Sequence, residues 1–253
     1  MKKTLSLLAV LMVAGIATTP AQAATHYVSG FGGISWMNNM DISDTYTYAP
    51  TNGHNYTTST DLGSGLALTG AIGCDYGSYR LEAEVGYQTN DVKSAVDFDN
   101  GAVISYPLEG TRYAIRGDIS VLSLMGNGYY DFDLGSKVEL YATAGVGVAQ
   151  VSFHNVNSVY LTAKPEDISL DANNNPGFNG HETTLAWQVG AGISAPIADN
   201  VRLDLRYRYF ATTDFTISDY GSANWNPSNP DGTNSANTNL SSHSVLLGLR
   251  VNF

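Results

Sequence analysis

The stretch from Val201 to Tyr209 alternates apolar and charged residues with a period of two. Its odd-numbered residues are apolar or aromatic, whereas the even-numbered ones include Arg202, Arg206 and Arg208. This alternation predicts a β-strand with one apolar and one charged face. Three arginines on one face need water or a polar interior beside them, because an unpaired charge away from water is costly. The stretch therefore favours a barrel wall between lipid and a polar lumen over a strand of a soluble sandwich.

Eight segments of the chain carry similar alternation. They lie at about residues 25–36, 63–75, 79–90, 113–131, 137–151, 183–195, 200–211 and 244–253. In the fourth segment the alternation is interrupted, and we expect a β-bulge near Val121 and Leu122 to restore it. An even number of such strands predicts an all-β fold, an eight-stranded antiparallel up-and-down transmembrane β-barrel.

The connections between these segments are alternately short and long. Three are tight turns at residues 75–78, 133–136 and 196–199. The four long connections are Met37–Asp61, Asp91–Arg112, His154–Glu182 and Thr212–Ser241. Outer-membrane barrels have short periplasmic turns and longer extracellular loops, so we expect the long connections outside and both chain ends in the periplasm.

The long connections are strongly acidic. They hold 14 Asp and Glu residues against Lys93, Arg112 and Lys164, a net charge of −11. This charge fits a solvated surface, and it equally fits a recognition face for an extracellular ligand or a host surface, because loops on a rigid scaffold often bind partners.

Residues 1–23 have the three regions of a secretory signal peptide. Lys2 and Lys3 precede an apolar run over residues 5–17, and the small-residue stretch Ala21–Ala23 follows. We expect cleavage before Ala24 and a barrel domain over residues 24–253. The alternative, a membrane anchor, requires roughly 20 apolar residues, more than this run provides.

The mature chain is acidic. The leader holds two of the 12 basic residues and none of the 23 acidic ones, so the remaining chain has a net charge of −13. Nucleic-acid binding needs a basic footprint, which excludes nucleic acid as an expected partner.

Three phrases resemble the opacity-protein-like and surface-antigen family of eight-stranded outer-membrane proteins, which carry a porin-like β-barrel domain. They are Tyr79–Tyr87, Gly128–Phe132 and Asp204–Phe210. The resemblance implies a Gram-negative outer-membrane protein in contact with outer-membrane lipid. The family includes adhesins, antigens, structural anchors and proposed porins, so the resemblance is specific for architecture and leaves the activity open.

The last segment also resembles the closing strand of such barrels. One of its rows is apolar and ends on an aromatic residue, and in the family this aromatic is part of the signal read by the outer-membrane assembly machinery. By resemblance, the expected assembly signal consists of Val245, Leu247, Leu249, Val251 and Phe253.

Charged residues concentrate on the rows expected to face the lumen. Eight strands enclose an interior only just wide enough for side chains, so we expect these charges to pair and fill it. The predicted function is therefore a structural, adhesin or surface-antigen role with a largely plugged lumen. The alternative is a narrow porin-like channel for small solutes or lipophilic molecules. The predicted lumen network consists of Arg80, Glu82, Glu84, Arg116, Asp118, Glu139, Arg202, Asp204, Arg206, Arg208 and Arg250.

Aromatic residues gather at both ends of the expected strands. We expect two belts at the membrane interfaces. The belt near the short turns would hold Tyr76, Tyr79, Tyr129, Tyr130, Phe132 and Phe253, and the belt near the long connections Trp36, Tyr87, Tyr113, Phe153, Tyr207 and Tyr209.

The sequence contains no recognisable catalytic or metal-binding motif. Its five histidines are scattered, without a His-Glu-x-x-His pattern. His243 and Ser244 are adjacent, and adjacent strand residues face opposite sides, so they cannot form a catalytic pair. The oxygen-rich stretches Asp97–Gly101 and Asp171–Asn175 lack the closing Glu of a calcium loop. We expect no enzyme activity, cofactor or metal site, and we expect the lone Cys74 to pack as a small apolar residue.

Overall fold

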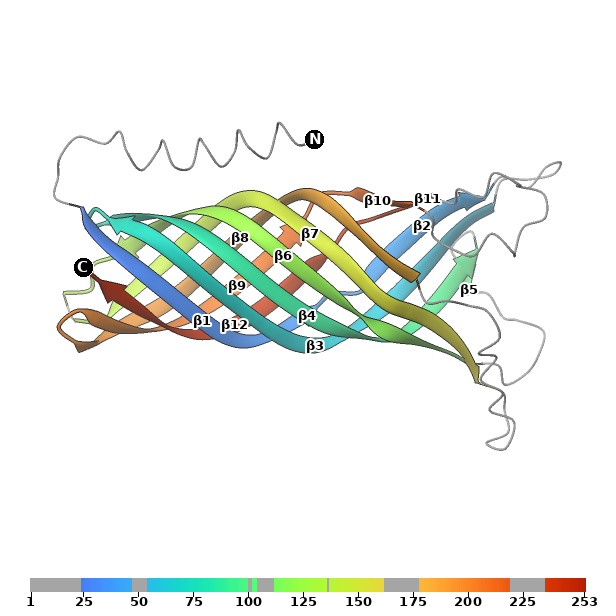
Figure 1. Ribbon diagram of the computed structural model, residues 1–253, viewed down its shortest axis with the longest axis horizontal. Coiled ribbons are helices and arrows are strands. Elements are labelled where there is room, and N and C mark those ends of the chain that lie inside the picture. The colour runs from blue at the N-terminus through green and yellow to red at the C-terminus, as the bar shows by residue number, and fades with distance from the viewer. Residues whose placement is uncertain are drawn as a thin grey trace.

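The structure is a long barrel of β-strands (Figure 1). This computed structural model describes residues 24–46, 54–99, 102–103, 112–135, 137–161, 178–218 and 235–253. The expected leader, residues 1–23, lies outside these ranges. Among the described residues, no helix has the length and apolar character needed to cross a membrane.

Eight long strands close the barrel. Each pairs antiparallel with its neighbours, and the first strand pairs with the last. This closed antiparallel ring confirms the predicted fold. The strands are β1 (Thr25–Met37), β3 (His54–Asp75), β4 (Tyr79–Asp99), β6 (Arg112–Phe132), β7 (Glu139–Leu161), β8 (Phe178–Ala198), β9 (Val201–Thr212) and β12 (Ser241–Asn252).

Four shorter strands extend the sheet at the end of the barrel where the long connections lie, which we call the loop end (Figure 1). β11 pairs with both β10 and β2, β2 pairs with β3, and β5 pairs with β4. The short strands are β2 (Met40–Tyr46), β5 (Ala102–Val103), β10 (Phe215–Ser218) and β11 (Ser235–Thr238).

The prediction that the four long connections are entirely loops was wrong. β3 already begins at His54, β4 continues to Asp99 and β7 continues to Leu161. The added part of β4 still alternates, with Val92, Val96 and Phe98 on one row, but the added parts of β3 and β7 mix apolar and polar residues on both rows. Alternation is expected only where one face of a strand meets lipid, so the added parts of β3 and β7 carried no pattern that predicts a strand.

The bulge in β6 lies earlier than expected. The register of β6 against β7 shifts between Arg116 and Asp118, and Gly117 has a φ of +143°, which only glycine adopts readily. From Ile119 onward the pairing is regular, with Val121 opposite Val151. No bulge is needed at Val121, because the barrel interior there is apolar and accepts this side chain.

The interior has two chemically different halves. Buried polar and charged side chains fill the half toward the short turns. Toward the loop end, buried apolar side chains from the long strands pack together with others from the β2, β10 and β11 extension. This apolar cluster contains Met37, Met40, Leu62, Val92, Ile119, Val121, Met125, Ala149, Val151, Phe153, Ala186, Phe210, Phe215, Ile217, Ala236 and Leu240.

Two of the residues expected in the aromatic belts face inward. Tyr129 is buried beside the lumen charges, and Phe153 belongs to the apolar cluster. Tyr129 follows Asn127 on the inner row of β6, and Phe153 follows Val151 on the inner row of β7, so strand alternation overrides the preference of aromatic rings for the interface. Most of the other expected belt residues, including Trp36, Tyr87 and Tyr207, are exposed.

Candidate functional site

The candidate site is the polar interior, whose centre is a carboxylate with two arginines. Glu84 on β4 is fully buried, and Arg206 Nη1 lies 2.9 Å from its Oε2. Arg208 Nη1 lies 3.9 Å from Oε1, and Gln188 Nε2 donates to the same oxygen at 3.0 Å. Three strands therefore converge on one acid, since alternation on β4, β8 and β9 turns these side chains inward.

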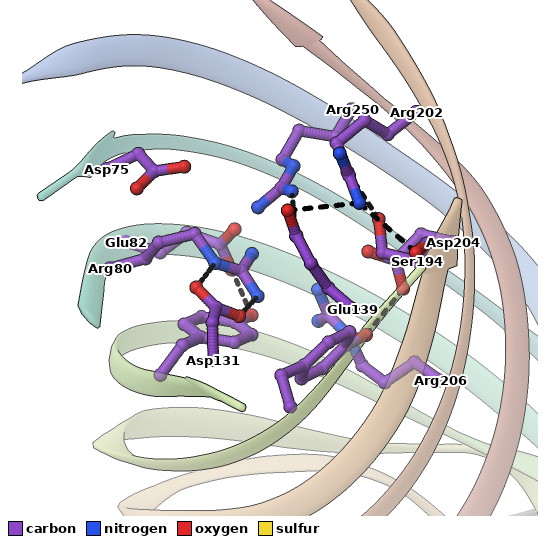
Figure 2. Close-up of polar contacts among 12 residues, drawn as sticks. Asp75, Arg80, Glu82, Asp131, Glu139, Ser194, Arg202, Asp204, Arg206 and Arg250 are labelled. Carbon is purple, nitrogen blue, oxygen red and sulfur yellow. Dashed lines mark hydrogen bonds and ion pairs between the residues drawn. The ribbon is translucent and has the colours of Figure 1, made fainter. Parts of the chain in front are cut away.

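A second carboxylate lies toward the short turns, between two arginines (Figure 2). Glu139 on β7 accepts from Arg250 Nη2 at 3.1 Å, and Arg202 Nη2 lies 3.1 Å from its other oxygen. Its side chain is 34% exposed. Arg202 also donates to the Ser194 hydroxyl at 2.9 Å. This group ties β7 to β8, β9 and β12 at the mouth of the barrel.

A third group is a bidentate pair surrounded by aromatic rings. Arg80 Nε and Nη2 donate to the two oxygens of Asp131 at 2.8 and 2.7 Å, in the parallel geometry that makes such pairs strong (Figure 2). The guanidinium carbon lies 4.3 Å from the ring centroid of Tyr129 and 4.9 Å from that of Tyr141. Arg80 thus packs against two tyrosine rings while it pairs with Asp131.

Two further carboxylates are bound by neutral donors. Glu82 accepts hydrogen bonds from the Tyr129 hydroxyl at 2.6 Å and the Tyr27 hydroxyl at 3.1 Å. Ser29 and Asn127 also donate to Glu82, both at 3.3 Å. Asp204 accepts from the Tyr141 hydroxyl. Tyrosines from β1, β6 and β7 thus take the place of direct ion pairs.

The structure places most of the expected network residues in this interior, with two exceptions. The side chain of Arg116 lies outside the described residues. Asp118 belongs to the outer row of β6, together with Leu122 and Leu124, because the bulge at Gly117 reverses the facing. The expectation for Asp118 was therefore wrong. Nine expected residues do face inward: Arg80, Glu82, Glu84, Glu139, Arg202, Asp204, Arg206, Arg208 and Arg250.

Sequence reasoning missed Asp131 and the tyrosines of this network. Asp131 lies four positions after Asn127, and this even spacing on β6 is the sequence feature that places it on the inner row. Tyr27 and Tyr141 also lie on the inner rows of their strands, but their hydrogen bonds depend on which strands face one another across the barrel. Sequence alternation does not contain that information.

Two histidine contacts lie away from the polar interior. Ser120 Oγ lies 2.9 Å from His154 Nε2, and Asp118 is opposite His154 in the β6–β7 register. Ser120 is only 7% exposed, so its hydroxyl is covered and we assign it no catalytic role. The buried Cys74 thiol lies 3.3 Å from His26 Nδ1. Within the described ranges, no group of three His, Cys, Asp or Glu side chains is arranged to hold a metal ion.

Comparison with known proteins identifies the family. The family model described as "Outer membrane protein beta-barrel domain" matches residues 6–253. The chain belongs to this family. It is thus an outer-membrane β-barrel protein, as the resemblance implied.

Members of known name are similar over much of the chain. "Outer membrane protein PagN" of Salmonella typhimurium is 27% identical over 246 residues, which cover 96% of this chain and 95% of the relative. A Rickettsia conorii protein named "Putative adhesin RC1281" is 25% identical over 199 residues, covering 75% of this chain and 69% of the relative. Neither name describes an enzyme. The crystal structure of OprG from Pseudomonas aeruginosa, which shares the fold, has a TM-score of 0.50 at 16% identity, covering 91% of this chain and 96% of OprG.

Proposed function

We propose that this protein is an adhesin-like surface protein: a rigid barrel with a largely filled lumen that presents acidic segments to an extracellular ligand or a host surface. In this proposal the loop end is extracellular and both chain ends are periplasmic. The outer-membrane assembly machinery recognises the closing strand with Val245, Leu247, Leu249, Val251 and Phe253. Outer-membrane lipid surrounds the barrel wall.

The pairing of charges inside the barrel is the observation that carries this proposal. Ion pairs and hydrogen bonds hold these charged side chains of the described interior: Arg80, Arg202, Arg206, Arg208 and Arg250 with Glu82, Glu84, Asp131, Glu139 and Asp204. Each carboxylate has a hydrogen-bond or ion-pair partner. Such pairs hold the strands of the wall together, because separating one pair would leave an isolated charge away from water. The buried apolar cluster fills much of the described interior toward the loop end, which supports a largely filled lumen.

The sheet extension at the loop end supports a recognition role. β3, β4 and β7 continue as paired strands well past the residues where the outward apolar rows end. Rigid strands position the segments between them, and such segments on a fixed scaffold are frequent binding sites. Their charge of −11 favours a basic surface on the ligand. The name of the Rickettsia conorii relative describes an adhesin, which agrees with this role.

Adhesion of a non-adherent Gram-negative strain expressing the protein tests the proposal. We expect expression to confer binding to host cells, and we expect Asp41→Asn with Asp91→Asn, both exposed toward the loop end, to weaken it and reduce its salt dependence. The matched control is Asp133→Asn with Asp199→Asn, which removes two exposed acids near the short turns. Equal adhesion with and without the protein would contradict the adhesin role.

The rival function, a narrow porin-like channel, has one observation in its favour. Arg208 Nε and Arg250 Nε and Nη1 are buried and have no hydrogen-bond partner in the described protein. Buried donors of this kind are usually satisfied by water. Water that enters from the short-turn end reaches Arg250 even if the interior is closed toward the loop end. A channel requires in addition that water passes between the side chains of the apolar cluster.

A further inference from the structure

Five aromatic and imidazole rings gather on one part of the outer wall, toward the loop end. Trp36 on β1 pairs with His243 on β12, and His243 pairs with Tyr209 on β9. The ring centroids of Tyr209 and His243 are 5.0 Å apart, and those of Tyr209 and Trp187 on β8 are 5.4 Å apart. With Tyr207, these residues form a continuous patch across four neighbouring strands, which we call the aromatic wall.

A hydrogen bond organises the aromatic wall. The Tyr207 hydroxyl lies 2.6 Å from His243 Nδ1. When the phenol donates to Nδ1, the imidazole keeps a proton on Nε2, and this N–H remains available as a donor. An ordinary interfacial belt needs only aromatic rings at the right depth. A fixed imidazole between two tyrosines and two tryptophans is a more specific arrangement, because it orients a polar donor beside several ring faces.

The charge around the aromatic wall distinguishes it from another part of the outer surface. Over the described parts of β1, β8, β9 and β12, the outward rows contain no Asp or Glu. On β4 and β6, in contrast, Asp91 and Asp118 are paired directly with one another across the strands and both face outward. Two adjacent carboxylates repel an anionic ligand. The outward rows around the aromatic wall contain no such repelling group in the described residues.

Apolar side chains continue the aromatic wall toward the short turns. Ile34, Val189, Leu205, Val245 and Leu247 are exposed on the same four strands. The surface is thus polar-aromatic at one end and aliphatic below it. A ligand that fits this surface has a headgroup with flat ring faces and a hydrogen-bond acceptor, and this headgroup is joined to acyl chains.

We propose that the aromatic wall binds an anionic glycolipid of the outer leaflet, with phosphorylated sugars as its headgroup. The C–H faces of the sugar rings would stack on Trp36, Trp187 and Tyr209, whose π-faces are electron-rich. A phosphate oxygen would accept from His243 Nε2, and the acyl chains would lie on the aliphatic rows. The assignment to the outer leaflet rests on the proposed orientation, with the loop end outside. The binding chemistry itself is independent of the adhesin role.

The test measures lipid retention by the full-length mature protein. The protein is refolded in detergent, mixed with equal amounts of lipid A and phosphatidylglycerol, and examined by native mass spectrometry. We expect preferential retention of lipid A. Trp187→Leu with His243→Asn should weaken this retention about tenfold, and Tyr207→Phe, which keeps the ring but removes the hydroxyl, about threefold.

Tyr87→Leu is the matched control, since Tyr87 is an exposed aromatic on β4, outside the aromatic wall. This variant should retain lipid A like the wild type. Heat-modifiable migration in detergent gels verifies that each variant is folded. Equal retention of the two lipids, or an equal loss in the Tyr87 variant, would overturn the proposal and leave an ordinary aromatic belt. Because the assay contains no host cells, its outcome is separate from that of the adhesion test.

Discussion

Glu84 illustrates how single residues stabilise the interior. Its carboxylate is fully buried and is bound by Arg206, Arg208 and Gln188, which reach it from β8 and β9. A buried carboxylate of this kind is stable only with its partners in place, because its desolvation must be offset by ion pairs and hydrogen bonds. The buried charge of Glu84 therefore contributes little net stability to the fold. Its removal is nevertheless destabilising, because the arginines around it remain buried without their counter-charge.

Glu84→Gln should destabilise the barrel strongly. The substitution leaves the buried Arg206 guanidinium without its counter-charge, which costs about 3–5 kcal/mol in buried pairs. Unfolding of the refolded protein in urea, followed by the change in gel migration, measures the effect. Glu139→Gln serves as the comparison and should cost less, because the Glu139 side chain is 34% exposed and solvent screens its arginines. Equal stability of the Glu84→Gln variant and the wild type would contradict the assigned ion pairs.

At the scale of the element, the seam between β1 and β12 closes the barrel. Gly33 lies opposite Leu246 in this seam, and a Cβ added to Gly33 would collide with the carbonyl oxygen of Val245. Gly30 lies on the same strand, opposite Leu249, and a Cβ there meets nothing within 4 Å. One glycine is thus required by close backbone packing, and the other is not.

Gly33→Ala should impair folding, whereas Gly30→Ala should not. The first substitution forces the backbones of β1 and β12 apart, and overpacking of this kind costs about 1–3 kcal/mol. The second adds a methyl group to a free outward position. The fraction of folded, fast-migrating protein after refolding compares the two variants. Similar folded fractions would show that the seam tolerates a wider separation than the structure has.

The closing strand gives a second prediction at this scale. Phe253 is exposed, and its backbone N–H donates to the carbonyl oxygen of His26 at 2.8 Å. Deleting Phe253 should greatly lower the yield of protein assembled in the outer membrane, with a much smaller effect on protein refolded in detergent, because the proposed assembly signal acts only in the cell. Phe253→Trp should preserve assembly. An unchanged yield after the deletion would argue against the proposed assembly signal.

At the scale of the whole molecule, sequence alternation predicts the barrel where lipid enforces it. The facings of β4, β7 and β9 follow the alternation of Leu, Val and Tyr with polar residues, because one side of each strand meets lipid. The pattern fails where that constraint is absent. Toward the loop end, both rows of the extended parts of β3 and β7 mix apolar and polar residues, so these parts were missed. Beside the apolar cluster the inner row of β6 is itself apolar, so the bulge was misplaced.

The candidate site was predictable to a similar degree. Alternation identifies Arg80, Glu84 and Arg206 as inward residues, and the near balance of charge predicts that they pair. It does not give the partners, since the pairing of Arg80 with Asp131 depends on the β4–β6 register and that of Glu84 with Arg206 on proximity across the barrel. Three-dimensional contacts between distant strands are needed to assign them.

Single-channel conductance of the refolded protein in a planar bilayer tests the central claim, a largely filled lumen, most directly. We expect no stable openings from the wild type. We also expect none from Arg206→Ala, because the Arg80–Asp131 and Arg250–Glu139 pairs and the apolar cluster still occupy the described interior. Stable, discrete openings of the wild-type protein, with a conductance that changes in Arg206→Ala, would contradict the account and make the lumen the functional site.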